Sequence, residues 1–238
     1  ELIHQQLQEF YRSKALLYMS DRAKKRFRVF YPELLKQVAR HPQQQLLLDK
    51  MLALLSSISG RSVYFELLYQ NIPLLMKLVD LFDSSSWIAK EVTRHPFLLE
   101  SLLYPEQLSE RFDQAILQQS LQIQLDNVSG DVEMELDTLR QFKRAHTIEI
   151  ATAEIAGEID TSEVSLYLSR LAQILLQAIY DLSWNDLVAQ YGEPKCVIND
   201  QVMTPGMGII AYGKLGGLEL GYGSDLDLVF LHAGTSEQ

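Results

Sequence analysis

Two aspartates near the end of the chain, Asp225 and Asp227, have the type and spacing that suit a divalent metal ion. They begin the apolar run Asp225–Leu231, which predicts a strand. Successive strand residues point to opposite faces, so we expect the two carboxylates to share one face while Leu226 and Leu228 anchor the other in the core. Paired carboxylates suit Mg²⁺ bound together with substrate phosphates. A solvated Asp pair at a strand start is equally compatible with the pair alone.

The residues upstream of this pair favour the metal interpretation. Residues 208–212 predict a short buried strand, residues 214–220 one or two helical turns, and Gly213 precedes Asp225 with eleven residues between them. This order is that of the nucleotidyltransferase fold, in which a strand is followed by a glycine, a short helix, a Gly-Ser pair and a strand that begins with Asp-x-Asp. Glycine lets the backbone approach a phosphate, and N–H groups at a helix start favour an anion. We therefore expect nucleotide-binding positions at Gly213, Lys214, Gly223 and Ser224, although Lys214 could equally be a surface lysine.

Competing motifs fail on inspection. Gly208–Lys214 fits the first part of a P-loop, but Leu215 replaces the Ser or Thr that binds Mg²⁺, and the intervening residues favour a strand. The Asp225 pair is not an EF-hand, because Val229 and Phe230 replace later ligand and turn positions.

The elements that would position these residues are mostly helical. Good helix formers dominate residues 1–157, with breaks expected at positions such as Pro32 and before the helix of Asp160 and Glu163. That helix should end at Gly192. The predicted fold is mostly α, with an N-terminal helical bundle over residues 1–157. The beginning of an α+β nucleotidyltransferase domain, DNA polymerase β-like and truncated, follows over residues 158–238.

Composition excludes several classes of protein. The formal net charge of −10 argues against a general nucleic-acid binder, and the basic residues at 22–28 read as a solvated helix face. A single cysteine, Cys196, allows no internal disulfide or cysteine zinc cage and fits a reducing cytosol. No apolar run approaches membrane-spanning length, so we expect a cytoplasmic protein. The chain lacks a starting Met, and we expect it to begin inside a longer protein.

Residues 211–232 resemble the signature of the glutamine synthetase adenylyltransferase family; they read AYGKLGGLELGYGSDLDLVFLH. Residues 139–145 (LRQFKRA), 154–157 (EIAG) and 93–99 (TRHPFLL) are also similar to that family. The resemblance extends from about residue 55. Two positions depart from the common pattern: Lys214 follows Gly213 where Gly-Ser or Gly-Gly is usual in the superfamily, and Gly223 stands where the family often has Ser.

The resemblance implies a bifunctional enzyme built from two related nucleotidyltransferase halves. One half attaches AMP from ATP to a tyrosine of glutamine synthetase in an Mg²⁺-dependent reaction, and the other removes it by phosphorolysis. The PII signal protein and glutamine set the balance. The sequence around Asp225 resembles the C-terminal, attaching half more closely than the removing half. The resemblance implies that Asp225 and Asp227 are catalytic metal ligands.

Three alternatives remain at this point. The chain could belong to the removing half, it could be a helical partner-binding module without chemistry, or it could be a different nucleotidyltransferase that acts on a nucleotide or an antibiotic. In the resembling family a third carboxylate comes from a later strand, and Glu219 and Glu237 are weak substitutes. We therefore expect the isolated chain to fold but to be inactive.

Overall fold

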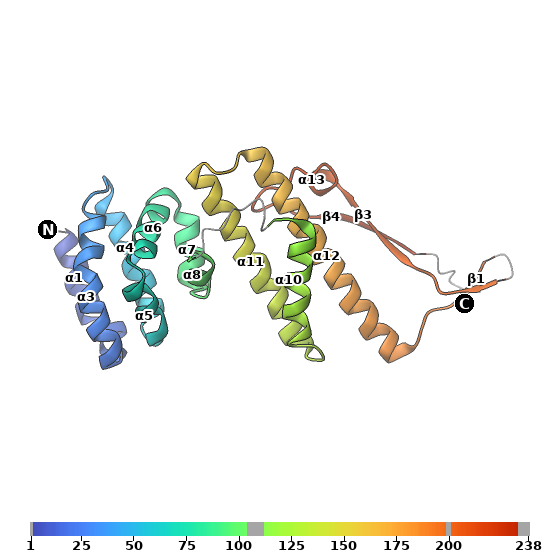
Figure 1. Ribbon diagram of the computed structural model, residues 1–238, viewed down its shortest axis with the longest axis horizontal. Helices are drawn as coiled ribbons and strands as arrows, with labels where there is room; N and C mark the ends of the chain where they lie inside the picture. The colour runs from blue at the N-terminus through green and yellow to red at the C-terminus, as the bar shows by residue number, and fades with distance from the viewer. Residues whose placement is uncertain (1, 104–111, 199–200, 233–238) are drawn as a thin grey trace. The chain divides into compact units, whose positions relative to one another are not determined.

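The computed structural model describes residues 2–103, 112–198 and 201–232. It is mostly helical, as predicted, with small antiparallel hairpins toward the C-terminus (Figure 1). The chain packs as two compact units, Glu1–Pro105 and Glu106–Gln238. The predicted domain boundary between residues 157 and 158 stays a prediction. No helix in the described ranges is long and apolar enough to cross a bilayer.

The first unit is a bundle of helices of amphipathic sequence. Its aromatic centre is formed by Phe27, Phe30 and Phe65, whose rings lie 5.8–6.4 Å apart and are almost fully buried. The helices of this unit are α1 (Leu2–Arg12), α2 (Lys14–Tyr18), α3 (Asp21–Val38), α4 (Gln44–Ser57), α5 (Ser62–Gln70), α6 (Ile72–Ser84), α7 (Ser86–Arg94) and α8 (Leu98–Ser101).

The predicted helix break at Pro32 is wrong, because α3 continues through it. A proline inside a helix removes one hydrogen bond and costs about 3 kcal/mol. Buried side chains lie on both sides of the proline, among them Phe27, Phe30 and Leu34. Each contributes about 1.5–3 kcal/mol on burial, so tertiary packing outweighs the local penalty.

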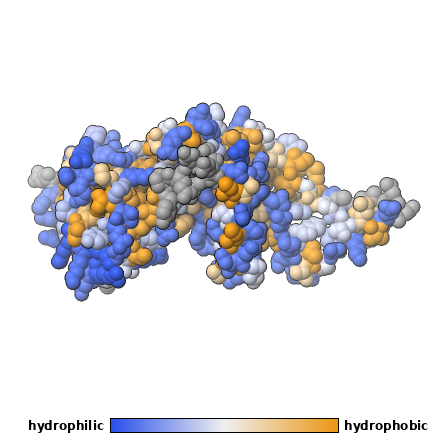
Figure 2. All heavy atoms as spheres, viewed as in Figure 1, coloured by the Kyte–Doolittle hydropathy of each residue, from blue (hydrophilic) through white to orange (hydrophobic). Residues whose placement is uncertain are grey.

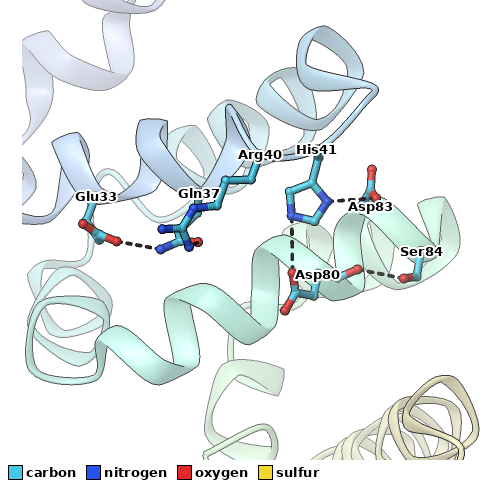
Figure 3. A network of polar contacts seen from close by, with 7 residues as sticks. All are labelled: Glu33, Gln37, Arg40, His41, Asp80, Asp83 and Ser84. Atoms are coloured by element: carbon cyan, nitrogen blue, oxygen red, sulfur yellow. Dashed lines mark hydrogen bonds and ion pairs between the residues drawn. The ribbon is translucent and has the colours of Figure 1, made fainter.

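A polar network joins the end of α3 to α6 in this unit (Figure 3). His41 lies between two carboxylates of α6, with Nδ1 3.0 Å from Asp83 Oδ2 and Nε2 3.3 Å from Asp80 Oδ1. Arg40 and Gln37 continue the network, and the Gln37 amide donates to Glu33. These two contacts give His41 a structural role at the junction between the end of α3 and α6.

The second unit is organised by three helices packed against one another: α10 (Gln114–Asp126), α11 (Val132–Ala156) and α12 (Thr161–Tyr191) (Figure 1). The predicted start of α12 is confirmed by a capping box, in which the Asp160 side chain accepts from Glu163 N–H and the Glu163 carboxylate accepts from Asp160 N–H. The predicted end is also confirmed, with Gly192 at the C-cap.

Two antiparallel hairpins follow α12. Strand β1 (Cys196–Ile198) pairs with β2 (Gln201–Met203), and β3 (Met207–Tyr212) pairs with β4 (Asp227–His232). A single helical turn, α13 (Gly213–Gly216), begins directly after β3. Leu215 of this turn and Leu220 beyond it are buried in the same core as α10, α11 and α12. These two leucines anchor the glycine-rich segment to the helices.

The strands are less buried than the sequence predicted. Ala211 and Leu228 pack against the helical core, but Ile210, Val229 and Phe230 are at least 41% exposed. Apolar side chains accordingly appear on the surface around this hairpin (Figure 2). A hairpin of two strands covers only part of its own apolar surface, which is why such a sheet is marginal alone.

Candidate active site

Asp227 is the first residue of β4, and its carboxylate lies against the backbone of Gly213. The register pairs Asp227 with Tyr212, the last residue of β3. Gly213 then leaves the strand with φ +53°, and a Cβ built on it would overlap Asp227 Oδ2 and lie 3.3 Å from Cγ. The left-handed backbone favours glycine at position 213, and the missing Cβ leaves room for the Asp227 carboxylate. The predicted approach of Gly213 to a phosphate stays a prediction.

Asp225 lies outside β4, which corrects the predicted strand start by two residues. The physical reason is the turn at Gly213: β3 ends at Tyr212, so no β3 residue lies opposite Asp225 for pairing. The alternation of side chains nevertheless continues upstream of the strand. Ser224 and Leu226 line a cavity against the helices, whereas Asp225 and Asp227 are exposed. This alternation supports a shared face for the two carboxylates, which stays a prediction.

The expected core position of Leu226 needs a related correction, because this side chain is 40% exposed. It borders a cavity of about 180 Å³ between α11, α12 and residues 220–226. The floor is apolar and is supplied mainly by leucines of α12, while Lys143 and Thr147 of α11 line it as well. Asp225 and Asp227 are not among the residues that line this cavity.

A tight turn delivers the chain to Asp225. The Ser224 N–H donates to Gly221 O over 3.1 Å, and the Gly221 N–H donates to Ser224 Oγ over 3.0 Å. Ser224 thus closes the turn with two hydrogen bonds to Gly221, one through its backbone N–H and one through its hydroxyl oxygen. At Gly223 a Cβ would meet nothing within 4 Å. Steric contacts in the fold therefore do not require glycine at that position. The predicted contact of Gly223 with a nucleotide stays a prediction.

Lys214 stands in the first turn of α13 and is exposed. Helix α13 is only four residues long. Its dipole is therefore smaller than that of the helix predicted over residues 214–220. Its backbone closes tightly, because Glu219 N–H donates to Lys214 O over 2.7 Å. For an anion at this turn, the positive charge of the Lys214 ammonium would therefore matter more than the dipole of α13.

One long-range contact was not predicted from the sequence. Tyr222 Oη donates to Glu154 Oε2 of α11 over 2.7 Å, across 68 positions of sequence. Burial, and next the hydrogen bond to Glu154, raise the pKa of the half-buried Tyr222 phenol. The tyrosine is visible in the sequence between two glycines, but nothing in the local pattern identifies its partner.

The donor set fits a magnesium ion in its chemistry. Asp225 and Asp227 supply exposed hard oxygens, which Mg²⁺ prefers, and phosphates and water commonly complete its shell. Among the described residues no three His, Cys, Asp or Glu side chains are grouped as a metal site. Glu219 therefore does not complete such a group, and Glu237 lies outside the described residues.

Comparison with known proteins gives the context of this geometry. The family model described as glutamate-ammonia ligase adenylyltransferase matches residues 75–238, which include the whole β3–β4 region. The chain belongs to this adenylyltransferase family. Bifunctional glutamine synthetase adenylyltransferase/adenylyl-removing enzymes are similar to it: that of Thioalkalivibrio sulfidiphilus is 42% identical over 87% of the chain, and that of Hahella chejuensis is 33% identical over 99%.

The chain spans about a fifth to a quarter of the length of these adenylyltransferase relatives, namely 21% of the Thioalkalivibrio protein and 24% of the Hahella protein. The family match covers the helices of the second unit as well as the hairpin that carries Asp225 and Asp227. Membership therefore rests on the scaffold and on the site together.

Proposed function

We propose that this chain is part of a longer enzyme, here called the intact enzyme, in which it begins the site that transfers AMP from ATP to a tyrosine of glutamine synthetase. The observation that carries the proposal is the pair of exposed carboxylates, Asp227 at the first position of β4 and Asp225 two residues before it, with Gly213 leaving room for the Asp227 carboxylate. The adenylyltransferase family match over residues 75–238 supports it.

The proposed reaction is a substitution at the α-phosphorus of ATP. The tyrosine oxygen attacks the α-phosphorus of ATP, and a new oxygen–phosphorus bond forms. The bond from that phosphorus to the bridging oxygen breaks, pyrophosphate leaves with the electron pair, and the phenolic proton passes to solvent. Catalysis of this step requires mainly alignment and neutralisation of phosphate charge.

In this proposal Asp225 and Asp227 hold Mg²⁺. When bound, the ion neutralises phosphate charge and orients the reacting groups. Gly213 keeps the Asp227 carboxylate in place and presents backbone at the mouth of the site, while Lys214 offers a cation to the triphosphate. Gly223 and Ser224 form the turn that the nucleotide would approach. The remaining oxygen ligands would come from ATP, water and a further carboxylate of the intact enzyme.

Two other features of the proposal follow from the family. The removing half of such an enzyme would use a similar site for phosphorolysis, in which phosphate attacks the tyrosine-bound AMP and releases ADP; this is the alternative function. The helical region predicted over residues 1–157 would bind glutamine synthetase or the PII signal protein, in the cytoplasm.

The test measures both reactions in the intact enzyme carrying Asp227→Asn. Transfer is followed with ATP labelled in the α-phosphate and unmodified glutamine synthetase, and removal with adenylylated glutamine synthetase and phosphate. We expect transfer to be lost and removal to remain. Asp186→Asn, an exposed acid on α12, is the matched control. Loss of removal alone would assign this site to the other half, and loss of neither would contradict the proposal.

A further inference from the structure

The segment that leads into Asp225 lies over a gap in the packing. Gly221, Tyr222, Ser224 and Leu226 all line the cavity of about 180 Å³ above α12. Atoms that border a cavity lack contact partners on that side. Leu220 anchors the beginning of the segment in the core, and Leu228 packs beyond its end. Apolar packing alone therefore gives residues 221–226 incomplete support.

A hydrogen bond supports the segment at its centre. Tyr222 Oη donates to Glu154 Oε2 over 2.7 Å, which is the usual distance for a well-formed bond between two oxygens. An ordinary phenol with a pKa near 10 is protonated at neutral pH, and burial raises the pKa of Tyr222 further, so it remains a donor. The bond crosses from the glycine-rich segment to the last turn of α11.

The Glu154 end of this bond is well fixed. Residues 148–153 of α11, immediately before it, are buried. Gly157 ends the helix with φ +73°, and its N–H donates to Glu154 O over 3.0 Å. Glu158 N–H closes the same cap on Ala153 O. Glu154 therefore projects from a backbone that is held by both core packing and a helix cap.

The Tyr222 end is coupled to the carboxylates through the turn. The two hydrogen bonds between Gly221 and Ser224 make residues 221–224 a closed unit, and Asp225 follows directly. We propose that Tyr222 is a positioning residue, whose hydrogen bond to Glu154 fixes the turn and thereby the placement of Asp225 and Asp227. This inference rests on the proposed function of those two carboxylates.

The test compares Tyr222→Phe with the intact enzyme of natural sequence. The substitution keeps the ring over the cavity and removes only the hydroxyl. We expect kcat to fall about tenfold, the usual consequence of losing one hydrogen bond to a charged group at a constrained site, and the half-saturating Mg²⁺ concentration to rise. General destabilisation would lower the active fraction without shifting the Mg²⁺ dependence. Tyr191→Phe, at an exposed tyrosine ending α12, should change neither.

The other end of the bond provides a second series. Glu154→Gln keeps an acceptor oxygen and should remain close to the natural enzyme, whereas Glu154→Leu should reproduce Tyr222→Phe. Combining Glu154→Leu with Tyr222→Phe should cost no more than either change alone, because both remove the same bond. Fully additive losses would overturn the proposal, and this series remains decisive if Tyr222→Phe folds poorly.

Hydrogen exchange separates this inference from the proposed function. In the intact enzyme carrying Tyr222→Phe, peptides spanning residues 220–228 should exchange faster, while those of α11 should not change. Unchanged exchange together with unchanged Mg²⁺ dependence would overturn the positioning role, even if Asp227→Asn abolished transfer. If Asp227→Asn left transfer intact, the proposed function would fail although the exchange result could still stand.

Discussion

The Asp227 carboxylate occupies the space where any residue other than glycine would place its Cβ at position 213. Strand pairing ends one residue before, at the Tyr212–Asp227 pair, and Gly213 turns the chain away with φ +53°. The contact therefore links two parts of the signature that are separated by a turn, a loop and a second turn. The missing Cβ of the glycine leaves room for the candidate metal ligand.

Gly213→Ala should disturb both the backbone and the carboxylate. The left-handed conformation alone costs a non-glycine residue about 1–2 kcal/mol, and the new methyl group must displace Asp227. A displacement of the order of 1 Å at a reacting centre lowers a rate about 100-fold. We expect AMP transfer by the intact enzyme to fall by that order, measured beside thermal unfolding.

Gly206→Ala is the matched control for that substitution, because a Cβ there meets nothing within 4 Å and the residue lies outside the candidate site. Its stability should change by no more than about 0.5 kcal/mol. If Gly213→Ala and Gly206→Ala had equal effects on transfer, the steric explanation for Gly213 would be wrong.

Tyr222 should resist ionisation at alkaline pH. An ordinary tyrosine ionises near pH 10, and burial with the bond to Glu154 raises the pKa of Tyr222. The folded-state pKa exceeds the unfolded one, so the stabilisation from this phenol is complete below about pH 10 and is lost as the pH rises through the raised value. The ionisation of Tyr222 is measured by subtracting the phenolate absorbance of Tyr222→Phe from that of the natural chain as the pH rises. A difference in absorbance that appears near pH 10 would refute the expectation.

The sequence predicted much of the scaffold because its signals were local. The capping box of Asp160 and Glu163 and the stop at Gly192 are properties of a few neighbouring residues, and both were confirmed. Pro32 shows the limit of such signals: its local penalty is overcome by buried residues on both sides, which only the tertiary structure reveals.

The candidate site was predicted in outline but not in its contacts. The order of β3, α13 and β4 was confirmed, whereas the start of β4 depends on where β3 ends, which is a pairing property. The bond from Tyr222 to Glu154 joins residues 68 positions apart, and no sequence period encodes such a contact. The overlap of Asp227 with a Cβ at Gly213 likewise emerges only when the strands are paired.

The 238-residue chain on its own should fold but transfer no AMP. Its two units have buried cores, so we expect a helical spectrum and cooperative thermal unfolding. Two carboxylates leave a magnesium site short of protein oxygens, and no third acid joins them in the described part of the chain. Transfer to glutamine synthetase at a rate comparable to the intact enzyme would show that the site is already complete.

The most direct test of the central claim is the Mg²⁺ dependence of AMP transfer by the intact enzyme carrying Asp225→Asn or Asp227→Asn. Each change preserves side-chain volume and removes one anionic ligand. We predict that transfer falls about 100-fold or more and that a higher Mg²⁺ concentration is needed, while thermal stability and the Asp186→Asn control stay near normal. Near-normal transfer by either variant at an unchanged Mg²⁺ requirement would contradict the assignment of these carboxylates as the metal ligands.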